Sequence, residues 1–191
     1  MDSFKDKTVI ITGGATGIGF GLAKRFGNEG AKIVIGEPRQ DKLDEAIAEL
    51  KGLGIDAAAM VMDVTDPNSM EAFADFAWET YGGGHVLINN AGIAIGRAPI
   101  VDTALADLHR LMNVNFFGVW HGAAIFGKRM IAQGEPAAIY NLASENAFFN
   151  AVQNSAPYIA SKHAVRGLTE AMRDEFPDHI HVGMFIPGFV A

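Results

Sequence analysis

The feature that most constrains this fold is a regular alternation of short apolar runs with stretches of helical length. It repeats six times along the 191 residues, without internal repeats or low-complexity segments. Short runs rich in β-branched residues are typical of strands that are buried on both faces of a parallel sheet. The alternation therefore predicts an α/β fold in one domain, residues 1–191, with a doubly wound parallel sheet between two helical layers.

Strands are predicted at residues 8–11, 31–36, 57–62, 86–89, 137–142 and 179–186. Helices are predicted at residues 20–29, 41–52, 66–81, 102–133 and 157–176, and we expect the fourth to be kinked or in two pieces. A glycine-rich turn, residues 12–19, joins the first strand directly to the first helix. Its glycines let the backbone approach a phosphate group, and the helix N-terminus offers free N–H groups to the anion. This arrangement indicates a Rossmann-type dinucleotide site.

Charge and composition exclude several classes of partner. The formal net charge is -7 and there is no basic run, which argues against nucleic acid and anionic membranes. The chain has no cysteine, so disulfides and thiolate metal sites are excluded, and we expect no metal site. Met1 is followed by a mostly polar segment, and no stretch is long enough to span a bilayer. We therefore expect a cytoplasmic protein.

Ligands of doubly wound sheets bind at the carboxyl ends of the strands. Here those ends carry the glycine turn, Glu37, Asp63, Asn90, Ser144 and Pro187-Gly188. Glu37 follows the turn by about twenty positions, where a carboxylate can accept hydrogen bonds from a ribose diol. The nearby Arg39 can hold a 2′-phosphate instead, but Thr16 in the turn is not basic and Glu37 repels a phosphate. We therefore expect NAD rather than NADP as the cofactor.

Tyr158 and Lys162 are four residues apart in a predicted helix, a spacing that puts both side chains on one face. A free tyrosine is a poor base at neutral pH, and an adjacent lysine ammonium favours the phenolate. The pair can therefore serve in proton transfer. An exposed helical pair without any function is the common alternative.

Together these segments resemble the classical short-chain dehydrogenase/reductase family. The matching residues, in the order and spacing of that family, are residues 12–19, Asp63-Val64, Asn89-Asn90-Ala91-Gly92, Asn115, Ser144, Tyr158, Lys162 and Pro187-Gly188. The resemblance implies hydride transfer between a nicotinamide cofactor and a secondary alcohol or ketone. It implies that Tyr158 is the general acid and base, activated by Lys162, which also holds the nicotinamide ribose. It further implies that Ser144 binds the substrate oxygen and that Asn115 anchors a water in a proton relay.

The resemblance also implies cofactor contacts. Gly13, Gly17, Ile18 and Gly19 would face the pyrophosphate, Asp63 the adenine, and Asn90 the ribose. Pro187, Gly188 and Val190 would lie near the nicotinamide. Thr16, Val64 and Glu37 complete the expected cofactor-binding set, together with Tyr158 and Lys162.

Three expectations concern the whole protein. Family members usually continue beyond the Pro-Gly pair with a lid and a last edge strand, whereas this sequence stops at Ala191. We therefore expect a longer natural protein, and the alternative function is a dinucleotide-binding module or fragment without turnover. Long helices, here residues 102–133 and 157–176, commonly pair across a two-fold axis in the family that the chain resembles, so the resemblance implies a homodimer or homotetramer. Phe148 and Phe149 belong either to the core or to an apolar pocket, and a pocket would favour a hydrophobic or aromatic substrate.

Overall fold

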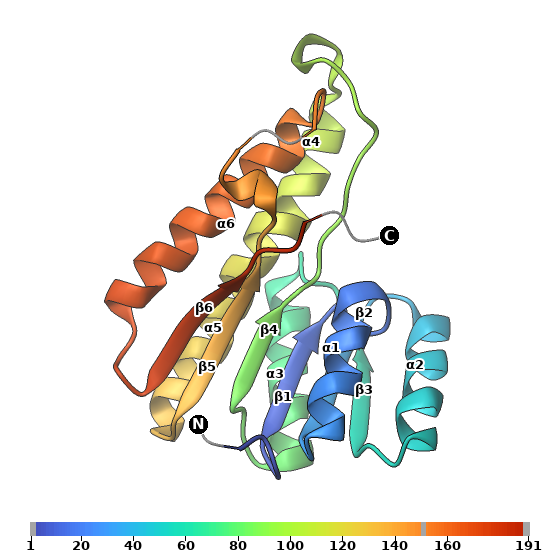
Figure 1. Ribbon diagram of the computed structural model, residues 1–191, viewed down its shortest axis with the longest axis vertical. Coiled ribbons are helices and arrows are strands. Elements are labelled where there is room, and N and C mark those ends of the chain that lie inside the picture. Colours follow the sequence, from blue (N-terminus) through green and yellow to red (C-terminus); the bar gives the residue numbers. More distant parts are fainter. Residues whose placement is uncertain (1–2, 150–151, 189–191) are drawn as a thin grey trace.

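The computed structural model describes residues 3–149 and 152–188, and its centre is a sheet of six parallel strands (Figure 1). The spatial order is β3-β2-β1-β4-β5-β6. The bounds are β1 Thr8–Thr12, β2 Lys32–Glu37, β3 Ala57–Val61, β4 Val86–Asn89, β5 Ala137–Leu142 and β6 Ile180–Phe185. The order reverses between β1 and β4, where doubly wound sheets open a crevice for ligands. The predicted fold class and all six predicted strands are confirmed, with strand ends shifted by one residue at most.

Helices connect successive strands. The α-helices are α1 Gly17–Asn28, α2 Gln40–Gly52, α3 Pro67–Tyr81, α4 Leu105–Met112, α5 Gly118–Gln133 and α6 Ala156–Glu175. Two short 3₁₀ turns are η1 Ile100–Asp102 and η3 Glu145–Ala147. Helix α1 begins at Gly17 rather than at residue 20, so it includes the last three residues of the glycine-rich turn. No helix in the described residues has both the length and the apolar character needed to cross a membrane.

The sheet lies between two helical layers, and the alternation of side chains along each strand divides the core in two. Val9 and Ile11 of β1 pack with Leu50 of α2 on one face. Ile10, between them, packs with Phe126 of α5 on the other face. All five side chains are fully buried. Burial of each such side chain contributes about 1.5–3 kcal/mol, so both layers hold the sheet rigidly.

The predicted helix over residues 102–133 is in two pieces, as expected. Helix α4 continues into α5 through η2, Asn113–Phe117, which is π-helical. A π-helical turn widens the helix locally and changes the direction of its side chains, and such turns are frequent at functional sites. Asn115 lies in this turn and is fully buried.

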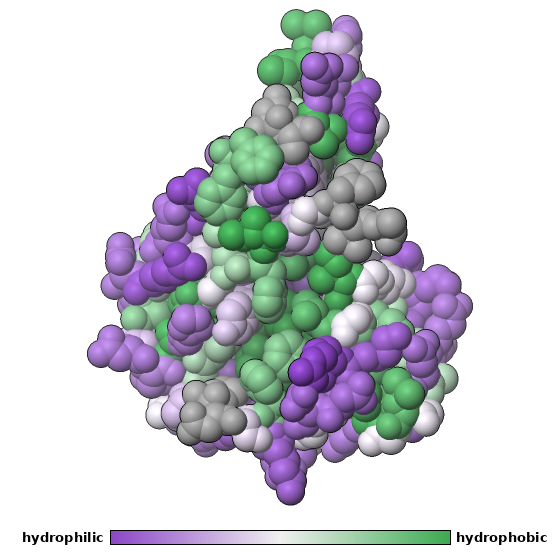
Figure 2. All heavy atoms as spheres, viewed as in Figure 1, coloured by the Kyte–Doolittle hydropathy of each residue, from purple (hydrophilic) through white to green (hydrophobic). Residues whose placement is uncertain are grey.

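Among the residues that the structure describes, no helix lies in front of one part of the sheet. Figure 1 shows α1 and α2 beside β1, β2 and β3, whereas β5 and β6 are open toward the viewer. Figure 2 shows hydrophobic side chains in the middle of the same face. Tyr140 of β5 and Phe185 of β6 stack there with ring centroids 4.9 Å apart. They line a cavity of about 480 Å³ together with Phe4 and Phe26, so this face is apolar and partly exposed.

Gly122 lies where α5 approaches the sheet closely. A Cβ added there would overlap Oδ1 of Asn89, a buried β4 side chain that also bonds to Asn141. We expect Gly122→Ala to lower the free energy of unfolding by about 1–3 kcal/mol, because the helix must move away from the sheet. Urea denaturation monitored by circular dichroism measures the change.

The matched control is Gly167→Ala in α6, where an added Cβ meets no atom within 4 Å. This control should raise the free energy of unfolding by about 0.5–1 kcal/mol, because alanine is the better helix former. Equal effects of the two substitutions would contradict the close approach of α5 to β4.

Candidate active site

The glycine-rich turn is fixed at the carboxyl end of β1. Gly13 and Gly17 have φ angles of 62° and 55°, left-handed values that favour glycine. The Gly13 N–H donates to the carbonyl oxygen of Gly36 at 2.7 Å. Nδ2 of Asn90 donates to the carbonyl oxygens of Thr12 and Gly13, both at 2.9 Å. The turn is therefore held between β2 and β4, and the first amides of α1 have no partner within the helix.

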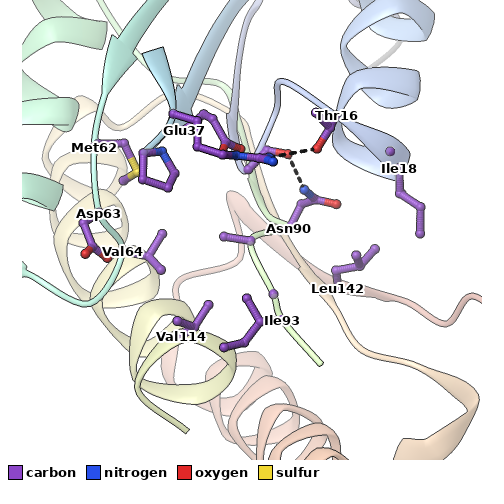
Figure 3. A pocket seen from close by; sticks show the side chains of 16 residues that line it. Thr16, Ile18, Glu37, Met62, Asp63, Val64, Asn90, Ile93, Val114 and Leu142 are labelled. Atoms are coloured by element: carbon purple, nitrogen blue, oxygen red, sulfur yellow. Dashed lines mark hydrogen bonds and ion pairs between the residues drawn. The ribbon is translucent and has the colours of Figure 1, made fainter. Parts of the chain in front are cut away.

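A groove of about 510 Å³ runs along this edge of the sheet (Figure 3). Eight predicted cofactor residues line it, namely Gly13, Thr16, Gly17, Ile18, Glu37, Asp63, Val64 and Asn90. Figure 3 shows Thr16 and Ile18 on the side of the glycine turn and Asp63 with Val64 on the opposite side. Residues far apart in the sequence thus form the walls of one continuous groove.

Gly19 is not among the residues that line this groove. A Cβ at Gly19 would overlap the side-chain amide of Asn90 and the carbonyl oxygen of Gly13. The missing side chain therefore lets α1 pack closely against the segment after β4. A direct contact of Gly19 with a cofactor stays a prediction.

A second cavity, of about 280 Å³, continues the groove and shares Ile18, Asn90, Gly92, Ile93 and Leu142 with it. Ser144, Tyr158, Lys162, Pro187 and Gly188 also line this second cavity. The structure thus brings together three of the four predicted catalytic residues, where β5 and β6 end and α6 begins. Val190 lies outside the described residues.

Lys162 is buried behind Tyr158. Its Nζ lies 5.6 Å from the centroid of the Tyr158 ring and donates to the carbonyl oxygen of Leu142 at 2.7 Å. Only 3% of Lys162 is exposed, and burial lowers its pKa from 10.5 to about 8. A low-dielectric environment disfavours the ammonium form, so this side chain loses its proton at a lower pH than an exposed lysine does.

Asn115 lies behind the cavity wall rather than in it. Its Oδ1 accepts from the Ile93 N–H at 2.7 Å, and its Nδ2 donates to the Ile93 carbonyl oxygen at 2.9 Å. Nδ2 also lies 3.3 Å from Oγ of Ser161, which in turn donates to the carbonyl oxygen of Tyr158 at 2.7 Å. The amide therefore connects η2 with the segment after β4 and with the helical turn that carries Tyr158.

Ser144 is buried at the end of β5, where its side chain caps η3. Its Oγ accepts from the backbone N–H and from Nδ2 of Asn146, both at 3.3 Å. Both contacts use the oxygen as an acceptor, so the hydroxyl hydrogen can still be donated to a substrate oxygen. The capping role and the predicted binding role are compatible.

A third cavity, of about 270 Å³, adjoins the second and shares Ser144, Tyr158 and Gly188 with it. Arg97 and Glu145 bring opposite charges to its lining. Phe148 and Phe149 are not lining residues; 44% and 56% of them are exposed, and the Phe148 ring lies 4.4 Å from the Arg166 guanidinium. The two rings therefore lie neither in the core nor in the lining of the cavities beside Ser144 and Tyr158.

Several contacts could not be found by sequence reasoning. The carbonyl oxygens of Leu142 and Ile93 hold Lys162 and Asn115, and no residue type signals such a contact because every residue has a carbonyl group. Ser161 follows Tyr158 by three residues in the same helix. At this spacing a serine hydroxyl can donate to the backbone carbonyl oxygen, so the spacing was the available sequence signal for this bond. Among the described residues no cluster of three or more histidine, aspartate or glutamate side chains could hold a metal ion.

A family model described as short chain dehydrogenase matches residues 7–191. The chain belongs to the short-chain dehydrogenase family. A C alpha-dehydrogenase from Sphingobium sp. strain SYK-6 is 38% identical to this family member over 173 residues, which cover 91% of this chain and 56% of the relative.

Two similar solved structures contain a nucleotide. One, from Burkholderia phymatum in complex with NAD, has a TM-score of 0.95 and 30% identity, and the match covers 100% of this chain and 68% of that one. The other, a gluconate 5-dehydrogenase from Burkholderia cenocepacia in complex with NADP and tartrate, has a TM-score of 0.91 and 33% identity, covering 98% and 72%. The chain thus spans between 56% and 72% of the length of these three proteins.

The burial of Lys162 predicts how the stability of the protein depends on pH. Between pH 8, the approximate pKa in the fold, and 10.5, the ordinary lysine value, the unfolded chain binds more protons than the folded chain. The free energy of unfolding must therefore rise with pH in this window. Between these two pH values we expect the free energy of unfolding of wild type to rise by up to about a few kcal/mol more than that of Lys162→Met.

Chemical denaturation at several pH values measures this difference. Removal of Lys162 also leaves the Leu142 carbonyl oxygen without its partner, but that offset does not depend on pH. Lys51→Met, at an exposed position of α2, is the control and should follow wild type. If the free energies of unfolding of wild type and Lys162→Met change in parallel with pH, burial does not lower the pKa of Lys162.

Proposed function

We propose that this chain interconverts a secondary alcohol and a ketone with the help of a nicotinamide dinucleotide. The observation that supports the proposal most is the continuity of two cavities. The groove at the glycine turn leads directly into the cavity where Ser144, Tyr158 and Lys162 meet. A dinucleotide needs a long site of this kind, with its reactive end beside a proton donor.

The residues present fit such a dinucleotide. Gly13 and Gly17 line the groove without a side chain, so a phosphate can approach the backbone of the turn closely. Glu37 offers a buried carboxylate for a ribose diol, and Asn90 lies at the middle of the groove. When bound, the nicotinamide ring supplies the hydride in reduction and takes it in oxidation.

The side chains of the protein provide the proton and the electrostatics. In reduction Tyr158 gives its hydroxyl proton to the carbonyl oxygen as the carbonyl carbon accepts the hydride, and in oxidation both transfers run backward. The ammonium of Lys162 stabilises the phenolate that Tyr158 becomes. Ser144 donates a hydrogen bond to the same substrate oxygen and stabilises the negative charge that develops there.

Asn115 acts as a positioning residue in this proposal. By holding both backbone groups of Ile93 and the hydroxyl of Ser161, it fixes two walls of the cavity relative to each other. A water bound near Lys162 and Asn115, which would connect the lysine with solvent, stays a prediction of the family resemblance.

The proposed cofactor is NAD rather than NADP. Glu37 is only 4% exposed and stands at the end of β2, where the ribose of the adenosine half would lie. A buried carboxylate accepts hydrogen bonds from two hydroxyl groups and repels a phosphate placed at the same point. Thr16, on the opposite side of the groove, adds no positive charge.

The cytoplasmic location and the homodimer or homotetramer stay predictions. In favour of assembly, α5 exposes two large apolar side chains, Trp120 and Ile131, and Phe117 precedes them in η2. Apolar surface on one side of a helix is commonly covered by a second subunit.

Tyr158→Phe tests the catalytic assignment. The substitution removes the proposed proton donor and should lower turnover by about 10²–10⁴-fold, while the Kd for NADH changes by less than about threefold. Turnover is measured by NADH absorbance with a panel of ketones, and NADH binding by fluorescence titration. The control is Tyr140→Phe, which removes a hydroxyl from β5 on the other side of the sheet.

Unchanged turnover in Tyr158→Phe would overturn the role of this tyrosine. If wild type binds NADH but converts no ketone or secondary alcohol in the panel, the alternative of a binding module without turnover is correct.

The cofactor preference is tested by comparing NADH and NADPH. We expect NADH to bind about tenfold more tightly than NADPH, because Glu37 accepts hydrogen bonds from the ribose diol of NADH and repels the 2′-phosphate of NADPH. Fluorescence titration at fixed ionic strength gives both Kd values. Equal affinity, or tighter binding of NADPH, would show that the choice of NAD is wrong.

A further inference from the structure

The side chain of Asn146 turns back onto the hydroxyl of Ser144, where η3 follows β5. Its Nδ2 and its backbone N–H both donate to Oγ of Ser144, each at 3.3 Å. Both residues are 6% exposed, and both line the cavity that Tyr158 also lines. The sequence did not predict Asn146 as a site residue, so this contact adds a residue to the candidate active site.

The hydrogen-bond capacity of a hydroxyl limits what Ser144 can still do. A serine hydroxyl has one hydrogen to donate and two lone pairs that accept. The two N–H groups of Asn146 use both lone pairs. Within residues 3–149 and 152–188 no protein atom accepts the hydroxyl hydrogen itself. That hydrogen is therefore left for an acceptor in the two adjoining cavities, both of which Ser144 and Tyr158 line.

We propose that Asn146 is a positioning residue that holds the Ser144 hydroxyl as a donor toward the substrate oxygen, an inference that rests on the proposed function. The two accepted hydrogen bonds leave the hydroxyl only one further bond to make, and they polarise its O–H group. The donor is thus oriented before negative charge develops on the substrate oxygen, which is the condition for effective electrostatic stabilisation. Asn146 acts through Ser144 and does not need to contact the substrate.

The substitution Asn146→Asp reverses the direction of this contact and keeps the shape of the side chain. A carboxylate has no N–H group, and its oxygen accepts the hydrogen of the Ser144 hydroxyl in a strong charge-assisted bond. The hydroxyl then donates to the carboxylate instead of the substrate. Asn146→Ala removes the Nδ2 donor but supplies no acceptor, so we expect its effect to be smaller.

A carboxylate at this position also repels the developing negative charge directly through space. That repulsion does not require the hydroxyl of Ser144, whereas the proposed positioning does. The two effects are therefore separated by making the same substitutions of Asn146 in a Ser144→Ala background, as a double-mutant cycle.

The experiment measures the single-turnover rate of NADH oxidation at neutral pH, with a ketone that wild type reduces. We expect about a tenfold loss for Asn146→Ala and about a hundredfold loss for Asn146→Asp, with the Kd for NADH within about threefold of wild type. In the Ser144→Ala background the loss from Asn146→Ala should fall below about threefold, because no hydroxyl remains to be oriented. The loss from Asn146→Asp should become at least about tenfold smaller there.

The matched control is Asn28→Asp, which makes the same change of charge at the exposed last residue of α1 and should alter neither the rate nor the Kd. Thermal unfolding confirms that each variant is folded, and the cycle of Asn146→Ala with Ser144→Ala decides the question if Asn146→Asp does not fold.

Losses of the same size with and without the Ser144 hydroxyl would show that the role of Asn146 is wrong, while the proposed function stands. A smaller loss for Asn146→Asp than for Asn146→Ala would lead to the same conclusion. If wild type converts no ketone or secondary alcohol, both the inference and the proposed function are wrong.

Discussion

The side-chain amide of Asn90 makes the contact on which the site depends. It follows β4, and its Nδ2 bonds to the carbonyl oxygens of Thr12 and Gly13 after β1. These strands are the neighbours between which the strand order reverses, so the amide joins the two halves of the sheet where the groove opens. Because Gly19 lets α1 approach the same amide, the turn, the helix and β4 are fixed relative to one another.

The end of the site near Tyr158 is organised by hydrogen bonds between buried side chains and backbone groups. Lys162 is held by the carbonyl oxygen of Leu142, the last residue of β5, and Asn115 by both backbone groups of Ile93. A buried polar group without such a partner would cost roughly 1–3 kcal/mol, so these contacts are strongly favoured. The positions of Lys162 and Asn115, and of the helical turn that carries Tyr158, therefore follow from where the strands end, and the rigid sheet keeps them in place.

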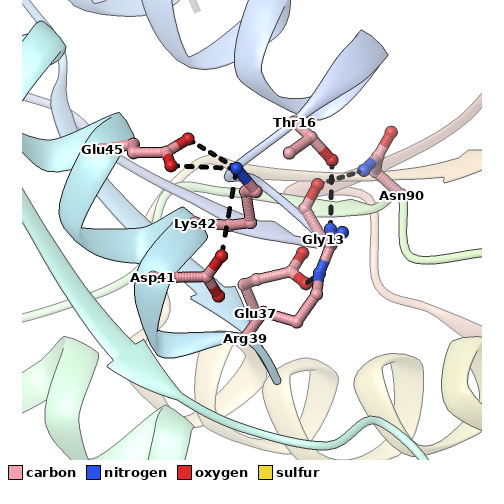
Figure 4. A network of polar contacts seen from close by, with 8 residues as sticks. All are labelled: Gly13, Thr16, Glu37, Arg39, Asp41, Lys42, Glu45 and Asn90. Atoms are coloured by element: carbon pink, nitrogen blue, oxygen red, sulfur yellow. Dashed lines mark hydrogen bonds and ion pairs between the residues drawn. The ribbon is translucent and has the colours of Figure 1, made fainter.

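The sequence predicted the parallel sheet and its strand boundaries, because buried strands and glycine turns leave strong local signals. It further predicted that the helix over residues 102–133 is kinked or in two pieces, without placing the π-helical turn at residues 113–117. It also predicted most residues of the groove, since the carboxyl ends of parallel strands must share one edge. The sequence could not predict the ion pair between Arg39 and Glu37 (Figure 4), because two nearby opposite charges can pair with each other or be solvated separately. The placement of Phe148 and Phe149 depends on the turn after η3, whose course no periodic pattern determines.

Hydrogen–deuterium exchange with and without NADH tests the central claim most directly, since it locates the ligand along the whole chain. If the strand ends form one dinucleotide site, amides in residues 12–19, 37–39 and 90–93 should exchange more slowly with NADH present. Amides at the opposite edge of the sheet, such as those of residues 83–85 and 134–137, should not change. Slower exchange at that opposite edge would contradict the account. So would the absence of any slowing in residues 12–19, 37–39 and 90–93 at an NADH concentration that saturates binding.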